Sequence, residues 1–176
     1  MPPIVPVAVR ALTLADLPAY KVLRDDVLAH HEDAFTSDAA AEAQRSADSY
    51  RARLGRDDSS LPGPFTLGAW QGSRLVGAIT CEHDARVKVR HLGHIAGMMV
   101  ERAAQAQGVG SALLQATIER ARRDGLEQLT LSVTSDNTGA VRLYRRFGFT
   151  TYGHLPRATL VNGRALDKEL MRLPLQ

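Results

Sequence analysis

The fold is decided by residues 94–149, which read HIAGMMVERAAQAQGVGSALLQATIERARRDGLEQLTLSVTSDNTGAVRLYRRFGF. The run from His94 to Val100 is almost continuously apolar, which predicts a strand buried on both faces of a sheet. A polar loop with two glycines follows, and Ser111–Arg123 then has the apolar periodicity of an amphipathic helix. A buried strand, a glycine-containing loop and a helix in this order indicate an α/β unit.

Strand and helix patterns alternate again beyond this helix. Gly125 is placed to end it, and Leu129–Val133 is rich in residues that favour strands. Asp136 or Asn137 can cap a short helix, which stops at Gly148. We therefore expect a second strand and a second helix after the glycine-containing loop.

Two hairpins are expected on either side of this unit. Phe65–Trp70 and Arg74–Glu82 are strand-like runs joined by a three-residue turn that contains glycine. Phe149–Leu155 and Leu166–Leu173 are the closing strands, and Asn162-Gly163 is a strong signal for the turn between them. The central sheet is therefore expected to contain antiparallel as well as parallel pairs.

The N-terminal half supplies one more strand and two helices. We expect a strand at Val7–Leu12, a helix from Asp16 to Leu28, and a second helix over about Ala39–Leu54. Gly55–Pro64 is expected to be a surface loop, and Asp84–His91 a charged turn. The predicted fold class is α/β (α+β), with a mixed central β-sheet and flanking helices.

Length and composition favour one packed domain. The chain has 176 residues, of which 44% are apolar and 23% charged, so residues 1–176 are expected to form a single domain. The formal net charge is +3, and arginine accounts for 19 of the 22 basic residues. These arginines are scattered rather than interleaved with aromatic residues, which argues against a nucleic-acid-binding module.

The single cysteine and the hydropathy pattern indicate the cellular compartment. Cys81 lies in an apolar stretch, which predicts a buried residue rather than a nucleophile and leaves no partner for an intramolecular disulfide. No apolar run reaches the roughly 18 residues that a membrane-spanning helix needs, and the N-terminus does not resemble a secretory signal. We expect a reducing, cytoplasmic setting without membrane attachment.

The strongest chemical signal is the loop Gln105–Ser111 between the strand and the helix. Its glycines allow successive N–H groups to converge on an anion, and the positive end of the helix dipole adds to the attraction. A dinucleotide-binding fingerprint requires a small residue where Leu113 stands, and a phosphate-binding P-loop requires a Gly-Lys pair that is absent. The alternative is that the glycines only make a tight turn.

Here the sequence resembles the GNAT superfamily of acyl-CoA-dependent N-acyltransferases. Its signature, Gln/Arg-x-x-Gly-x-Gly/Ala after a buried strand, is matched by Gln105–Gly110. A second family pattern, Asn-x-x-Ala-x-x-x-Tyr before an aromatic-Gly-Phe unit, is matched by Asn137, Ala140, Tyr144 and Phe147–Phe149. The resemblance extends over essentially the whole chain.

The resemblance implies acetyl-CoA as acyl donor and a pair of central strands that splay apart to admit it. One of these strands ends at Val100 and the other is Leu129–Val133. Backbone amides of the loop would bind the pyrophosphate, backbone groups of the strand end would bind the pantetheine arm together with Asn137, and the small Ala140 would leave room for it. The implied contact residues are Met98, Met99, Val100, Gln105, Ala106, Gln107, Gly108, Val109, Gly110, Ser111, Asn137, Ala140 and Tyr144.

The resemblance also implies the catalytic groups. A neutral amine attacks the thioester, and the residue matching Tyr144 protonates the departing thiolate. Many relatives place a glutamate base where His94 stands, so His94, Glu82 or water is left to accept the amine proton. A tyrosine that merely packs the core and a histidine that merely hydrogen-bonds in the sheet are the alternatives.

The acyl acceptor is expected to be a primary amine of a small molecule or a peptide. The loops Glu32–Asp38, Arg56–Pro64 and His154–Arg164 are expected to select it. The resemblance to the family also implies a possible homodimer. Carboxylates could draw a cationic amine toward the cleft; the candidates are Glu32, Asp33, Asp38, Glu42 and Glu82.

Two other classes of function stay open. One is a non-catalytic domain that binds or senses CoA, and the other, less favoured, is the basic nucleic-acid-binding module. A metal site is not expected, because the His91-x-x-His94 pair and the adjacent His30 and His31 have no third ligand at suitable spacing.

Overall fold

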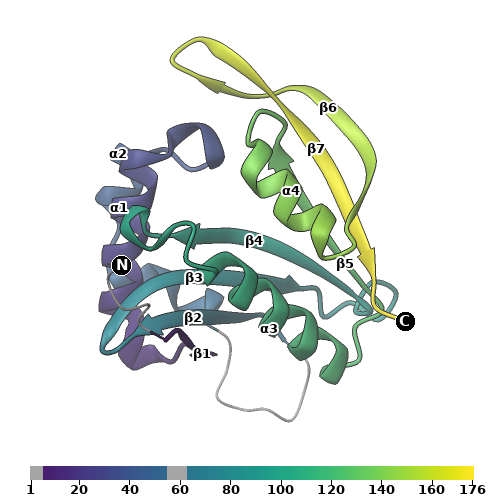
Figure 1. Cartoon of the computed structure of the whole chain (residues 1–176), viewed down its shortest axis with the longest axis horizontal. Coiled ribbons are helices and arrows are strands. Elements are labelled where there is room, and N and C mark those ends of the chain that lie inside the picture. Colours follow the sequence, from purple (N-terminus) through teal and green to yellow (C-terminus); the bar gives the residue numbers. More distant parts are fainter. Residues whose placement is uncertain (1–5, 55–62) are drawn as a thin grey trace.

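A computed structural model of the chain describes residues 6–54 and 63–176. One sheet joins strands from both halves of the chain in the order β1-β2-β3-β4-β5-β7-β6. Its strands are β1 (Ala8–Ala11), β2 (Phe65–Gln71), β3 (Arg74–His83), β4 (Leu92–Val100), β5 (Gln128–Thr134), β6 (Thr150–Val161) and β7 (Arg164–Pro174). The helices are α1 (Leu17–His30), α2 (Ala39–Ala43), α3 (Val109–Arg123) and α4 (Thr138–Arg146). The predicted mixed α/β class is confirmed (Figure 1).

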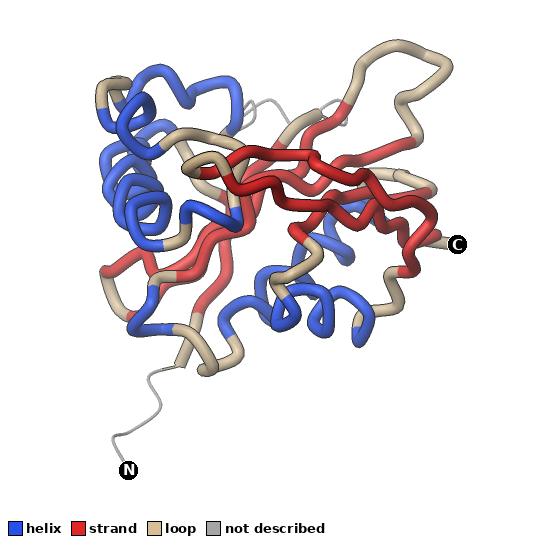
Figure 2. The backbone as a smooth tube through the Cα atoms, turned by 90° about the horizontal axis from the view of Figure 1, so that it is seen from above, coloured by secondary structure: helices blue, strands red, loops and turns tan. Residues whose placement is uncertain are grey.

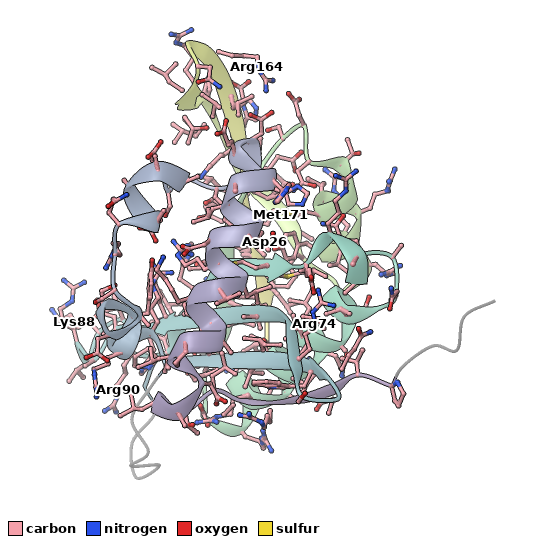
Figure 3. The ribbon with its side chains drawn as sticks, turned by 90° about the vertical axis from the view of Figure 1, so that its left-hand side faces the viewer. Asp26, Arg74, Lys88, Arg90, Arg164 and Met171 are labelled. Carbon is pink, nitrogen blue, oxygen red and sulfur yellow. The ribbon has the colours of Figure 1, made fainter. Side chains whose placement is uncertain are left out.

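Helices cover both faces of the sheet (Figure 2). On one face, α1 packs Tyr20 and Leu23 against a cluster that includes Met99. Figure 3 shows this helix lying across the strands, with Asp26 on its outer side. On the other face, α3 buries Leu113 and Leu114, which are fully inaccessible to solvent. Burial of such apolar surface on both faces is the main stabilising contribution to the sheet.

The centre of the sheet splits. Strands β4 and β5 are parallel and pair from Leu92 with Gln128 as far as Ile95 with Leu131, where the pairing ends. All other neighbouring strands are antiparallel. Figure 1 shows β5 turning away from β4 beyond this point. The predicted splayed pair is therefore confirmed, and the far half of β4 lacks a strand neighbour on this side.

The expectation that His94–Val100 is buried on both faces is wrong. Ile95 and Met99 are buried, at 4% and 1% exposure, but His94 is exposed and Met98 is only half-buried. The split accounts for Met98, since β5 leaves β4 after Ile95 and Met98 lines the cleft that opens there. His94 still pairs with Thr130 on β5, and its exposure is due to the two cavities that it lines. An apolar run can therefore indicate a strand that lines a cleft as well as a strand that is covered on both faces.

The predicted second helix over Ala39–Leu54 is also wrong in its continuity. It consists of the short α2 and a separate 3₁₀ segment, Ala47–Arg53. The break brings the Tyr50 hydroxyl within 2.7 Å of Glu42 Oε2. In one continuous α-helix these two residues would be separated by about 12 Å along the axis, at 1.5 Å per residue. A buried polar contact therefore outweighs helix propensity here.

The segment expected as a loop at His154–Arg164 is mostly strand. Strands β6 and β7 continue to the turn at Asn162-Gly163, where both residues have positive φ, of 49° and 78°. Pro156 is accommodated because β6 is an edge strand with a register shift between Leu155 and Thr159. Figure 3 shows Arg164 near the far end of this hairpin.

Several local predictions are confirmed. Gly125 and Gly148 follow α3 and α4 with φ of 77° and 92°, as helix-ending glycines do. Cys81 is fully buried, and burial raises the pKa of its thiol to about 12.

The described part of the predicted loop Gly55–Pro64 is residues 63–64, and the rest lies outside the described residues. No helix in the described parts of the chain has the length and apolarity to cross a membrane.

Candidate active site

The split between β4 and β5 opens into a cleft of about 730 Å³. Its walls come from three segments that the sequence pointed to: the end of β4, the loop leading into α3, and one face of α4. A fourth wall comes from the end of α1 and from Ala34 and Phe35, which belong to the loop Glu32–Asp38 that the sequence predicts to select the acceptor. The lining residues include Phe35, Met98, Gln105, Gly108, Gly110, Ser111, Asn137, Ala140, Leu143 and Arg146.

The N-terminus of α3 points its free amides at this cleft. Gly108 is the N-cap, with φ of 80°, a left-handed conformation that glycine adopts without strain. The first N–H groups of a helix, here from Val109 onward, lack partners within the helix. Gly110 keeps the floor open, because a Cβ there would lie 3.0 Å from Met98 Cε and 3.3 Å from Leu143 Cδ2. The geometry suits a phosphate group.

Some side chains around the loop Gln105–Ser111 line the cleft and others lie away from it. Gln107 lies away from the cleft, since its Nε2 donates to Ala103 O at 2.7 Å and its Oε1 accepts from Gln71. Gln105 lines the cleft and donates to Val100 O at 3.3 Å. Arg146 also lines it and donates to Ser111 Oγ at 3.0 Å, which adds a full positive charge to the helix end.

The three residues at the end of β4 play different parts. Met98 faces the cleft and contacts Tyr144. The side chain of Met99 is buried in the core under α1, so only its backbone is available to a ligand. Val100 lines the cleft, but its carbonyl already accepts a hydrogen bond from Gln105.

Asn137 and Ala140 lie where α4 begins. Asn137 is the N-cap of α4, and its Oδ1 accepts from Ala140 N at 3.2 Å, as the sequence predicts. Both residues line the cleft. Since the cap occupies Oδ1, the amide Nδ2 is the group of Asn137 that is left for a ligand.

Tyr144 lines a second cavity, which shares Met98, Asn137 and Ala140 with the cleft. Its side chain is buried, at 7% exposure, and its ring packs edge-on against Phe149 with centroids 5.7 Å apart. Among the described residues the hydroxyl has only a weak partner, Met98 Sδ at 3.6 Å. Burial raises its pKa to about 12, so the hydroxyl keeps its proton at neutral pH.

The second cavity, which Tyr144 lines, has a volume of about 280 Å³. His94 lines it, and His94 Nδ1 lies 3.0 Å from Thr130 Oγ1. Glu82 is the register partner of His94 on β3, but it lines a separate cavity on the other side of His94. Of the two side chains predicted as candidate bases, only His94 therefore shares a cavity with Tyr144.

The charges around this second cavity contradict the expectation that carboxylates draw a cationic amine toward the site. The described residues that line it include Arg24, Arg53 and Lys168 and no carboxylate. The acids expected to draw in an amine lie elsewhere: Glu42 forms a buried ion pair with Arg24, Asp38 caps α2, Asp33 bonds Arg164, and Glu32 and Glu82 line other cavities.

The buried ion pair between Arg24 and Glu42 fixes the wall of the second cavity to which Arg24 belongs. Arg24 is 2% exposed and donates through Nε to Glu42 Oε2 at 2.8 Å. Burial alone would raise the pKa of Glu42, but hydrogen bonds from Tyr50 and Arg24 lower that pKa to about 2. The same pairing raises the pKa of Arg24 in spite of burial. Both groups are thus charged at neutral pH.

Sequence reasoning missed four cations: Arg24, Arg53, Arg146 and Lys168. No local pattern distinguishes these residues from the chain's other basic residues. Arg24 does offer one signal, because it falls between the core positions Leu23 and Val27 of an amphipathic helix. A charged residue on that side of a helix must be paired or functional.

Comparisons with known proteins agree with this architecture. The family model described as "Acetyltransferase (GNAT) family" matches residues 24–149. Among solved structures, an acetyltransferase of the GNAT family from Streptococcus pneumoniae superposes with a TM-score of 0.87 at 25% identity, over 96% of this chain and 99% of that one. YncA, a putative acetyltransferase from Salmonella typhimurium with its cofactor acetyl-CoA, gives 0.83 at 23% identity, over 97% and 95%.

A curated relative adds a third similarity. The L-methionine sulfoximine/L-methionine sulfone acetyltransferase of Salmonella typhimurium is 36% identical over 129 residues, 72% of this chain and 66% of that protein. The chain spans less than two thirds of the length of the curated relatives that it matches first. The fold is that of the GNAT acetyltransferases, and the chain belongs to this family.

Proposed function

We propose that the chain is an N-acetyltransferase that moves the acetyl group of acetyl-CoA to a primary amine of a small molecule or peptide. One observation carries the proposal: the cleft at the split between β4 and β5 is lined by the N-terminus of α3 and shares residues with the cavity that Tyr144 lines. Family membership supports the same reaction.

Binding of the donor follows from the cleft. The amides of Gly108–Ser111 and the guanidinium of Arg146 would hold the pyrophosphate. Backbone groups of Met98–Val100 have no strand neighbour on the cleft side, so they would pair with the amides of the pantetheine arm, together with Asn137 Nδ2. Asn137 Nδ2 makes no hydrogen bond among the described residues, and the first amides of α3 lack partners within the helix, which favours binding. Arg146 and Val100 O already have partners, in Ser111 and Gln105.

When bound, acetyl-CoA supplies a thioester whose carbonyl carbon forms a bond to the amine nitrogen while the bond to sulfur breaks. Tyr144 would donate its proton to the departing sulfur, because its raised pKa keeps it protonated. His94 would accept the proton that the amine loses, directly or through water. The narrow cavity beside Tyr144 would hold amine and thioester together, which supplies much of the rate.

Calorimetry with acetyl-CoA tests the donor site. The wild-type chain should bind it, and Gly110→Asp should weaken binding at least about 100-fold, because the new carboxylate would enter the cleft beside the pyrophosphate site. Gln115→Glu is the matched control, since it adds one negative charge to the exposed side of α3. Absence of wild-type binding, or equal affinity in a folded Gly110→Asp protein, would remove the proposal.

A further inference from the structure

Three cationic side chains line the cavity beside Tyr144. Arg24 comes from α1, Arg53 from the 3₁₀ segment and Lys168 from β7, so they approach from different sides. No aspartate or glutamate among the described residues lines the cavity. A small space that gathers positive charge in this way is complementary to an anion.

Arg24 has donors left for such an anion. Its Nε and Nη2 donate to Glu42 Oε2 and to Ser37 Oγ, at 2.8 and 3.0 Å. Within the described residues its Nη1 makes no hydrogen bond, although the side chain is only 2% exposed. A guanidinium carries five N–H groups, and the bonds to Glu42 and Ser37 use only Nε and Nη2. The ion pair therefore holds Arg24 in place and leaves Nη1 at the cavity.

Arg53 converges on the same point. A Cβ built on Gly97 would lie 3.6 Å from Arg53 Nη1 and 3.9 Å from Arg24 Nη1. Gly97 lines the cavity and has a φ of 62°, so no side chain separates the two guanidinium groups at this place. Two like charges so close together repel each other, and one anion bound between them would relieve that repulsion.

Lys168, on β7, is the third cation that lines the cavity. Its Nζ donates to Thr36 Oγ1 at 2.7 Å, and partial burial lowers its pKa. An anion in the cavity would therefore meet two guanidinium groups and an ammonium group. At about 280 Å³ the cavity is at the small end of ligand pockets, so it fits an amino acid better than a large amine.

We propose that the acyl acceptor carries a carboxylate next to the amine that is acetylated, as a free amino acid does, and that Arg24, Arg53 and Lys168 bind this carboxylate. The inference rests on the proposed N-acetyltransferase function. Guanidinium groups recognise carboxylates through two parallel N–H bonds, which also orients the acceptor. Since Tyr144 and His94 line the same cavity, an amine next to the bound carboxylate stays within the space that these two residues share.

The test compares acids with their amides. Each L-amino acid of a panel is assayed beside its carboxamide, with saturating acetyl-CoA, by release of the CoA thiol. The best amino acid should exceed its carboxamide at least about 100-fold in kcat/KM, because a carboxamide cannot form the charged pairs. The panel also contains amines without any acid group, such as polyamines.

Two variants assign the preference to residues. Arg53→Gln and Lys168→Gln should each raise the KM of the amino acid about 10- to 100-fold, while the KM of the carboxamide and of acetyl-CoA stays within threefold. Arg51→Gln and Arg172→Gln are the matched controls, since each removes one exposed positive charge from the same segment or strand. A purely structural role would change all three KM values together.

The two proposals fail in different ways. Equal turnover of acids and carboxamides, or an unchanged KM for the acid in both variants, would overturn the carboxylate site and leave the acetyltransferase function standing. Acetylation of polyamines alone would do the same. If the folded protein releases no thiol with any amine, the acetyltransferase function fails, and the carboxylate site fails with it.

Discussion

The two halves of the active site are built in different ways. The acetyl-CoA cleft comes mainly from Met98–Ser111 and Asn137–Arg146, and much of its chemistry belongs to the backbone. The second cavity, beside Tyr144, is where the acceptor is proposed to bind, and we call it the acceptor cavity. It is lined by Arg24, Arg53 and Lys168, which are far apart in the sequence, and its chemistry belongs to side chains. Backbone geometry persists through many substitutions, whereas a side-chain set changes with one. If the proposed roles are right, binding of acetyl-CoA should tolerate side-chain substitutions in the cleft better than selection of the acceptor tolerates them in the cavity.

Tyr144 stands between the two halves, and its substitution has the largest expected effect. Tyr144→Phe keeps the ring against Phe149 and removes only the hydroxyl, whose one partner in the described part of the chain is the Met98 sulfur. Turnover at saturating substrates should fall about 10²- to 10⁴-fold, the usual contribution of a general acid. Affinity for acetyl-CoA should stay within a few fold. Unchanged turnover would mean that the thiolate leaves without help from this residue.

Breaking the ion pair should damage the acceptor cavity more than the cleft. Glu42→Gln leaves Arg24 buried without its carboxylate, which should lower the free energy of unfolding by about 3 kcal/mol at pH 7. Urea unfolding measures the loss, with Glu119→Gln on the exposed side of α3 as control. The acceptor KM should rise while acetyl-CoA affinity holds. A rise in both would contradict the separation of the two halves.

The same pair predicts a pH dependence. The pKa of Glu42 is about 2 in the folded chain, below its ordinary value of 4.5, so its contribution to stability is present above pH 4.5 and is lost as the pH falls toward 2. The difference in unfolding free energy between wild type and Glu42→Gln should therefore shrink over this interval. A difference that stays constant from pH 7 to pH 2 would show that the carboxylate charge is not what stabilises the wall.

His94 carries the smallest expected effect, about 10²-fold at most, because water can replace a base. If His94 is the base, kcat/KM should have an ascending limb against pH that depends on this residue. His94→Ala should remove this limb and spare acetyl-CoA binding. A folded variant with the wild-type pH profile would assign the proton to water or to Glu82.

The difference between the halves also explains what the sequence could predict. The loop, its helix and the Asn137 cap are local, because residues within a few positions of one another determine them. The resemblance implied the split strands as well. The cavity of Arg24, Arg53 and Lys168 depends on long-range packing between α1, the 3₁₀ segment and β7, for which spacing gives no signal.

The errors in the fold have the same origin. The helix expected over Ala39–Leu54 breaks because Tyr50 turns back to Glu42, a contact that also supports Arg24. The strands of the last hairpin extend beyond the predicted ends at Leu155 and Leu166 up to the predicted turn at Asn162-Gly163, and the edge position and irregular register of β6 tolerate Pro156 there. Local propensity was overruled in both places by tertiary context.

Direct detection of the acetylated amine is the measurement that tests the central claim most directly. The chain is incubated with acetyl-CoA and the panel of amino acids, carboxamides and polyamines, and mass spectrometry follows each amine while thiol release is counted. The account predicts one amide product per thiol released, with carboxylate-bearing amines preferred and with Tyr144→Phe slowed at least about 100-fold. Acetyl-CoA binding without an amine-dependent product would contradict it and leave a domain that only binds CoA.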